Sequence, residues 1–242
     1  MYKNYRFEFK YELDPKKAYF IEKDVKRFGM RPDLNISSGN GEYFVTSLYY
    51  DSYDLSDYQD KAGGFLKRKK FRVRIYEPYL DKSSFVWVEI KDRFGSQNLK
   101  TRIKLSRLEF GQFLKDGART LLLKKWNDDE LAKKNEILWN FIKSSVKPKV
   151  LVCYKRKAFT DDFGKIRITF DSDLEACKKL DFIYTALMTP VNPDKLVMEI
   201  KYSHIGPQWF KTIVEKYDLK ADTYSKYEKS LETLHRFNPL LR

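Results

Sequence analysis

The chain has 242 residues, with 48 Lys and Arg against 34 Asp and Glu, and a formal net charge of +14. A hydrophobic content of 42% with 16% aromatic residues excludes an intrinsically disordered protein, and no apolar run is long enough for a membrane-spanning helix. Two cysteines, Cys153 and Cys177, make no disulfide framework and indicate a reducing, cytoplasmic setting. The excess of positive charge implies an anionic partner: nucleic acid, a membrane surface or a phosphate-rich ligand.

Period-two alternation of apolar and polar residues, which is typical of half-buried strands, dominates the chain. It predicts strands at residues 6–13, 43–50, 71–76, 85–93, 100–105, 150–159, 166–173 and 196–203. Amphipathic helices are expected at residues 14–29, 55–61, 106–115, 128–143, 207–216 and 225–236, the first with Asp14 as its N-cap before Pro15. Because strands and helices do not alternate strictly, the pattern favours an α+β fold with a large antiparallel sheet, in a single domain over residues 1–242.

Most predicted strands have one charged face on which arginine is prominent. In the strand at 71–76, Arg72 and Arg74 share one face, opposite Phe71, Val73 and Ile75. Further arginines occupy the charged faces of other strands: Arg93, Arg102, Arg156 and Arg167. A sheet with one solvated face would account for such alternation. The fork of arginine, however, matches phosphate oxygens, and so many cations on one open face would repel one another.

Closing the sheet into a barrel would gather the charged faces around a bore and leave the apolar faces to be covered by helices. About eight strands enclose a lumen wide enough for side chains or one small ligand. Glu8, Glu89 and Glu199 also point inward in this arrangement. Carboxylates among phosphate-binding cations indicate a divalent metal, although each acid could instead pair with Arg or Lys. Glu199, two residues before Lys201, is the strongest candidate ligand.

Nine short segments of the chain form a specific set when taken together and in order. They are FEFKYEL (7–13), SLYYDS (47–52), FRVRIY (71–76), VEIKDR (88–93), KTRIKL (100–105), CYKRKAF (153–159), IRITFD (166–171), MEIKY (198–202) and YSKYEKS (224–230). The chain therefore resembles the catalytic domain of the vacuolar transporter chaperone (VTC) polyphosphate polymerases, within the triphosphate tunnel metalloenzyme superfamily. The resemblance covers nearly the whole chain.

The resemblance implies a closed tunnel of eight antiparallel strands with helices packed outside. Such a tunnel would bind the triphosphate of ATP and thread a growing polyphosphate chain, in a phosphotransferase that uses Mn²⁺ or Mg²⁺. The catalytic, phosphate-binding cations carried over by position are Lys10, Arg72, Arg74, Lys91, Lys100, Arg156, Arg167 and Lys226. Tyr154, Lys201 and Ser225 would contact substrate. Glu199 would bind the metal, and Glu8 and Glu89 are the further candidate ligands.

The sequence departs from the family at Thr223, where relatives usually carry a lysine, so the phosphate contact of that lysine is not expected here. The basic run 67–70 is interpreted as a solvated approach to the strand that follows it, with attraction of anions to a tunnel mouth as the alternative. Most aromatic residues are expected in the core, and Tyr76 and Trp87 are the two candidates for a position near a nucleotide base.

Two further functions remain open: a metal-dependent inorganic or nucleoside triphosphatase on the same tunnel, and a polyphosphate-binding module without catalysis. A nucleic-acid-binding module is disfavoured, because the cations alternate with apolar residues inside strands and no recognition helix stands out. The expected partners are therefore ATP and polyphosphate, with no nucleic acid. The expected location is the cytoplasm, without a transmembrane segment of the chain's own, and a membrane-protein partner that would hold the chain near a membrane is left open.

Overall fold

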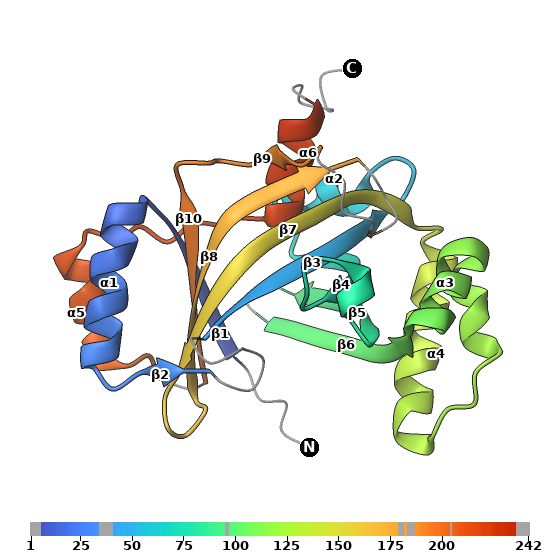
Figure 1. Cartoon of the computed structure of the whole chain (residues 1–242), viewed down its shortest axis with the longest axis horizontal. Helices are drawn as coiled ribbons and strands as arrows, with labels where there is room; N and C mark the ends of the chain where they lie inside the picture. Colours follow the sequence, from blue (N-terminus) through green and yellow to red (C-terminus); the bar gives the residue numbers. More distant parts are fainter. Residues whose placement is uncertain are drawn as a thin grey trace.

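The computed structural model describes residues 6–33, 41–94, 97–178, 182, 187–203 and 205–235, which form an α+β structure (Figure 1). Its strands are β1 (Arg6–Leu13), β2 (Arg31–Pro32), β3 (Glu42–Asp51), β4 (Lys67–Ile75), β5 (Phe85–Phe94), β6 (Gln97–Ser106), β7 (Lys147–Thr160), β8 (Ile166–Cys177), β9 (Thr189–Pro190) and β10 (Leu196–Ser203). Its helices are α1 (Pro15–Arg27), α2 (Ser56–Ala62), α3 (Arg107–Asp116), α4 (Asp128–Lys143), α5 (Gln208–Lys216) and α6 (Lys226–His235), with 3-10 helices at Leu80–Lys82 and Gly117–Leu122. Across the described residues, every helix is too short or too polar to cross a membrane.

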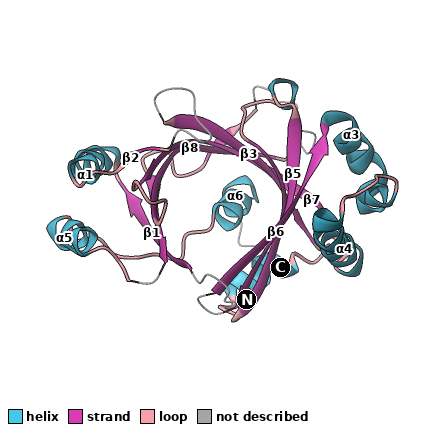
Figure 2. Ribbon diagram, turned by 90° about the horizontal axis from the view of Figure 1, so that it is seen from below, coloured by secondary structure: helices cyan, strands magenta, loops and turns pink. Residues whose placement is uncertain are grey.

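All ten strands belong to one antiparallel sheet, which confirms the predicted class. Eight of them follow the order β1-β10-β8-β7-β3-β4-β5-β6, while β2 pairs with β7 and β9 with β8. The sheet curls so strongly that its strands surround an interior space, which Figure 2 shows nearly end-on. The order ends at β1 and β6, and no backbone pairing joins these two strands within the described residues. The sheet is therefore a strongly curved one that hydrogen bonds do not close into a barrel.

The alternation pattern located each of the eight long strands and gave the full bounds of β1 and β10, while the bounds of the other six differ from those predicted. β4 begins at Lys67, and its residues pair with β5 from Lys67 opposite Phe94 to Arg74 opposite Trp87. The interpretation of run 67–70 as a solvated approach is thus wrong, because these basic residues are part of a paired strand. The two-residue strands β2 and β9 were not predicted. The last residue expected in the C-terminal helix, Arg236, lies outside the described residues.

Four helices cover the outer, apolar faces of the sheet, as expected. On one side, Ile21 of α1 and Ile213 of α5 pack against Ile168 and Met198 from β8 and β10. On the other side, α3 and α4 pack on the outer face of β3 to β6, where the apolar residues of those strands form the largest core. The opposite, charged face of these strands is thereby turned to the interior.

Helix α6 corrects the expectation that all helices lie outside. Its Tyr227 ring stacks on the ring of Tyr49 of β3 at 5.3 Å between centroids, and it shares a cluster with Tyr154 and Val150 of β7. The Tyr227 hydroxyl also donates to the buried carboxylate of Asp51 at 2.6 Å. Figure 2 shows α6 within the ring of strands. The inner face presents aromatic and aliphatic side chains at this level, and α6 packs against them.

The packing of α4 generates a stability prediction. Phe141 is 6% exposed, and its ring meets those of Phe71, Tyr50 and Phe113 at 5.2, 5.5 and 5.6 Å. Phe141→Ala should lower the free energy of unfolding by about 3–5 kcal/mol through lost burial and a cavity, measured by urea denaturation. Trp139 on the same helix is 65% exposed, so Trp139→Ala is the control. Equal losses in the two variants would contradict the packing of α4 against the sheet.

Candidate functional site

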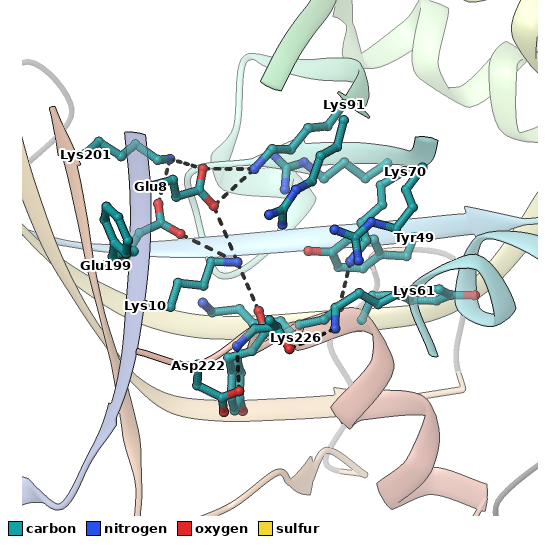
Figure 3. Close-up of a pocket in the computed structure, with 18 of the residues that line it drawn as sticks. Glu8, Lys10, Tyr49, Lys61, Lys70, Lys91, Glu199, Lys201, Asp222 and Lys226 are labelled. Atoms are coloured by element: carbon teal, nitrogen blue, oxygen red, sulfur yellow. Dashed lines mark hydrogen bonds and ion pairs between the residues drawn. The ribbon is translucent and has the colours of Figure 1, made fainter. Parts of the chain in front are cut away.

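The inner faces of β1, β4, β5, β7 and β10 line a cavity of about 380 Å³, together with the segment from Ala221 to Tyr227 that leads into α6. Its lining is rich in positive charge (Figure 3). The lysines and arginines are Lys10, Lys61, Arg68, Lys70, Arg72, Arg74, Lys91, Arg93, Arg156, Lys201 and Lys226, and the carboxylates are Glu8, Glu199 and Asp222. This excess of cations makes the cavity suitable for a polyanion.

The inner face of β4 supplies a row of four cations at every second residue: Arg68, Lys70, Arg72 and Arg74. Neighbours in such a row lie about 7 Å apart along the strand. Arg74 is 5% exposed and is held by two donated hydrogen bonds, from Nε to Ser47 Oγ at 2.9 Å and from Nη2 to the Tyr154 hydroxyl at 3.4 Å. Arg74 is therefore held in place at one end of the row.

Glu89 on β5 holds two of the predicted cations. Its carboxylate is fully buried and accepts from Arg72 Nε at 2.7 Å and from Lys100 Nζ at 3.1 Å. Burial alone would raise the pKa of Glu89, but the charges of Arg72, Arg74 and Lys100 keep this pKa well below its ordinary value. Glu89 does not line the cavity, and this placement suits the positioning of Arg72 and Lys100 better than metal binding.

Glu8 and Glu199 form a second charged cluster, where β1 pairs with β10. Lys201 Nζ lies 2.6 Å from Glu199 Oε1 and 3.6 Å from Glu8 Oε2, and Lys91 Nζ reaches Glu8 Oε2 at 3.0 Å. Lys10 Nζ lies 3.5 Å from Glu8 and 3.9 Å from Glu199 (Figure 3). Burial and the charge of Glu199 oppose ionisation of Glu8, but the three lysines outweigh them and lower its pKa to about 2.

The pair Glu8 and Glu199 fits a divalent cation that is shared with phosphate. Mg²⁺ in phosphoryl-transfer sites is held by one or two carboxylates together with substrate oxygens, and both of these carboxylates line the cavity in ionised form. Within the described part of the chain, no group of three or more His, Cys, Asp or Glu could hold a metal by itself. Phosphate oxygens and water would have to complete the coordination.

A third carboxylate, Asp171 on β8, joins β7 to α6. It accepts from Arg156 Nε and Nη2 at 2.6 and 2.7 Å, and Lys226 Nζ lies 2.6 Å from its Oδ2. The Tyr154 hydroxyl accepts from Arg156 Nη2 at 3.3 Å as well as from Arg74. A hydroxyl that accepts from two guanidinium groups keeps its own hydrogen for donation. Tyr154 can therefore donate to an anion in the cavity.

Most of the predicted site residues come together, and three lie outside the cavity lining. Lys100 and Glu89 form the ion pair described above, just behind the row on β4. Arg167 donates from Nη2 to the Tyr43 hydroxyl at 3.1 Å and pairs with Asp33 at 3.1 Å. It is the Cα partner of Lys201, which does line the cavity, so Arg167 flanks the site rather than forming part of it.

Several cavity residues were missed by sequence analysis. Lys70 donates to Ser225 Oγ at 2.7 Å, so the substrate-binding role expected for Ser225 is joined to a lysine that had been taken as solvated. Continuation of the two-residue period from Arg74 and Arg72 back to Lys70 could have found it. Lys61 reaches the cavity from α2 and donates to Thr223 Oγ1 at 3.2 Å, and no local pattern marks it. A cation thus lies beside Thr223, the position of the family's lysine.

Comparisons with known proteins agree with this geometry. The sequence matches the VTC domain family over residues 5–235. A crystal structure of a putative adenylate cyclase from Bacillus halodurans superposes with a TM-score of 0.51 at 12% identity, covering 93% of this chain and 96% of that one. A putative adenylyl cyclase from Hippeastrum, described as having a dominant triphosphatase activity, gives a TM-score of 0.50 at 10% identity, covering 97% of each chain. At these identities the likeness shows the fold alone. No curated protein matches significantly.

The environment of Lys70 predicts a pH dependence of anion binding. Burial and the neighbouring charges of Lys10 and Lys91 lower the pKa of Lys70 to about 7, so its positive charge is lost as pH rises through neutrality. Lys70→Arg keeps a charge at all these pH values. The affinity of Lys70→Arg for tripolyphosphate, relative to that of the wild type, should therefore rise several-fold between pH 6 and pH 9, measured by calorimetry.

The ratio of the two affinities removes the ionisation of the ligand itself from the comparison, because both proteins meet the same tripolyphosphate. A ratio that stays constant over this range would show that Lys70 remains charged in the cavity and would contradict the prediction.

Proposed function

The chain belongs to the VTC domain family, and we propose that it is an ATP-dependent polyphosphate polymerase, which transfers the γ-phosphate of ATP to the end of a polyphosphate chain. The observation that carries the proposal is the excess of cations in one continuous cavity. Eleven lysines and arginines against three carboxylates line it within the described residues, which is more positive charge than one triphosphate group needs. A polyphosphate chain that extends beyond the reacting phosphates accounts for the surplus.

The proposed binding mode uses the wall of the cavity as two gripping surfaces. The row on β4, led by Arg72 and Arg74, neutralises one side of the phosphate chain, and both side chains are already oriented by Glu89 and Ser47. Tyr154 donates from β7, which β3 separates from β4, and its hydroxyl lies 3.4 Å from Arg74 Nη2. Each charge-assisted contact of this kind contributes about 1.5–3 kcal/mol. Positioning and charge neutralisation of this kind are the main sources of catalysis in phosphoryl transfer.

The reaction itself needs no protein nucleophile. A terminal oxygen of polyphosphate attacks the γ-phosphorus of ATP, a new P–O–P bond forms, and the bond from the γ-phosphorus to the bridging oxygen breaks, so that ADP leaves with the electron pair. The attacking oxygen is already anionic, so no general base is required. Arg156 and Lys226, which Asp171 holds together, are placed to stabilise charge on the transferred group.

The metal ligands in this proposal are Glu8 and Glu199. A bound Mn²⁺ or Mg²⁺ would neutralise charge on the phosphate oxygens of the substrate. Lys10, Lys91 and Lys201 now occupy both carboxylates, and each of these lysines can turn to phosphate when the carboxylates engage a cation. In this proposal the lysines pair with the carboxylates in the absence of metal and pair with phosphate once the carboxylates bind the metal.

We further propose that residues 1–242 form one tunnel domain and that the protein works in the cytoplasm, where ATP is available. The ion pair between Lys91 of β5 and Glu8 of β1 supports a closed tunnel, because it spans the region between the sheet's two unpaired edges. Closure would then rest on side chains rather than on a backbone ladder.

A triphosphatase is the second candidate, because the Hippeastrum protein described as a triphosphatase shares the fold. A hydrolase has to orient a water molecule, usually with a carboxylate as base. Glu8, Glu89, Asp171 and Glu199 are each engaged by lysine or arginine, and Asp222 accepts from the backbone N–H of Thr223. This engagement favours transfer to a phosphate chain over transfer to water.

The products of ATP turnover test the proposed function. Incubation with ATP and Mn²⁺ should yield ADP and an acid-labile polymer that stains as polyphosphate after gel electrophoresis. Added short polyphosphate should shorten any lag, because it supplies chain ends that are ready to attack. Stoichiometric orthophosphate without polymer, at every metal and primer concentration, would decide for the triphosphatase. Retention of polyphosphate without any turnover would decide for a binding module.

The role of Glu199 gives a second test. Glu199→Gln keeps the size of the side chain but removes its charge, so polymer formation at limiting Mn²⁺ should fall by about a hundredfold, at the upper end of the loss seen for groups that support metal binding. Because a weakened ligand lowers metal affinity, high Mn²⁺ should restore part of the activity. The control is Glu215→Gln on the exposed side of α5. Full activity of Glu199→Gln at limiting Mn²⁺ would remove Glu199 from the metal site.

A further inference from the structure

Trp87 of β5 lies on the inner face of the sheet, directly beside the row of cations on β4. Its Cα partner on β4 is Arg74, which lines the cavity, and its partner on β6 is Lys104. Residues that are direct partners in an antiparallel pair project to the same face. The outward neighbours of Trp87, Val86 and Val88, are fully buried under α3 and α4. Trp87 itself is half-buried and turned inward.

A guanidinium group already lies over the Trp87 ring. Arg102 of β6 is exposed, and its Cζ lies 4.1 Å from the ring centroid. No ion pair involves Arg102 within the part of the chain that the structure describes, although Glu89, its Cα partner, binds Arg72 and Lys100. A plain surface contact would explain the pair if it stood alone. Trp87 and Arg102 do not line the cavity itself, but Trp87 is the cross-strand partner of Arg74, which does. A ligand that extends from the cavity past Arg74 would therefore reach this pair.

Of the two aromatics that the sequence allowed near a base, only Trp87 has this geometry. Tyr76 packs edge-on against Tyr43 at 5.9 Å and belongs to the margin of the cluster around α6. The other tryptophans lie elsewhere: Trp139 on the outer helix α4, Trp126 before α4 and Trp209 on α5. Trp87 is therefore the tryptophan placed beside the phosphate-binding surface.

We propose that Trp87 and Arg102 form a stacking site for the base of a nucleoside triphosphate whose phosphate chain lies in the cavity. The inference rests on the proposed use of ATP and adds where its nucleoside is held. Arg72 lies two residues from Arg74, about 7 Å along β4, so a phosphate chain gripped by these residues starts beside Trp87. One ribose bridges the step from phosphate to base. Arg102 Cζ now lies 4.1 Å from the centroid of the indole ring, so the guanidinium would swing away from the ring to admit the base between them.

Stacking determines the chemical class of the ligand. Every nucleobase has a π-face, so an aromatic ring and an arginine plane bind bases with little regard to their hydrogen-bonding edges. The site should accept nucleoside triphosphates in general and should contribute nothing to inorganic tripolyphosphate, which has no base. Comparison of these two ligands separates the stacking site from the phosphate grip.

The test is the affinity of Trp87→Ala for ATP and for inorganic tripolyphosphate, measured by calorimetry with EDTA present to prevent turnover. Loss of one stacked base should raise the dissociation constant for ATP about tenfold or more, while that for tripolyphosphate should stay within about twofold. Trp139→Ala is the matched control, since its indole is 65% exposed on the outer helix α4, and should change neither constant. Trp87→Phe should keep most of the ATP affinity.

If Trp87→Ala does not fold, Arg102→Ala is measured instead, and it should show the same selective loss of ATP affinity. The inference is overturned if the folded variants bind ATP as the wild type does, or if ATP and tripolyphosphate weaken equally. Because binding is read without turnover, the result is independent of the polymerase proposal. If the variants lose ATP affinity selectively and the wild type makes no polymer, the stacking site is supported and the polymerase proposal is refuted.

Discussion

The structure depends on holding many like charges together in a partly buried space. Cations placed this close repel one another and lose hydration, so each needs a partner before a ligand arrives. Four carboxylates meet this need. Glu89 pairs with two cations behind the row on β4 and Asp171 with two between β7 and α6. Glu8 and Glu199 share Lys10 and Lys201, and Glu8 also pairs with Lys91. These acids leave a net positive lining, which a phosphate chain can neutralise without any rearrangement of the backbone.

The fold produces this arrangement because one face of the sheet is apolar and the other is charged. Outer helices bury the apolar face, and the curvature of the sheet turns the charged face on itself (Figure 2). Helix α6 then occupies the apolar part of the interior and carries Ser225 and Lys226 to the edge of the charged part. Lys10 Nζ donates to the carbonyl oxygen of Tyr224 at 3.0 Å, which ties the first strand to the entry of this last helix. The two ends of the described chain thus meet at the site.

Local pattern was enough to predict the strands and much of the cavity, because side-chain alternation in a strand is a property of the backbone alone. Arg72 and Arg74 were placed correctly for this reason. The pairing of each charge could not be predicted in the same way, since Glu89 and Asp171 are neutralised by residues that only the curled sheet brings near. Lys70 was hidden within a basic run that looked solvated. Helix α6 was expected to pack outside with the other helices, but the apolar inner faces against which it packs come from strands far away in sequence.

The central claim is that the charged interior holds a linear phosphate chain. A crystal structure with inorganic tripolyphosphate tests it most directly, because the electron density locates every phosphorus atom. The account predicts the chain inside the cavity, with phosphate oxygens within hydrogen-bond distance of Arg72, Arg74 and the Tyr154 hydroxyl, and with Lys226 beside the same ligand. Tripolyphosphate bound only to exposed lysines on the outer surface, with the interior ion pairs intact, would contradict it.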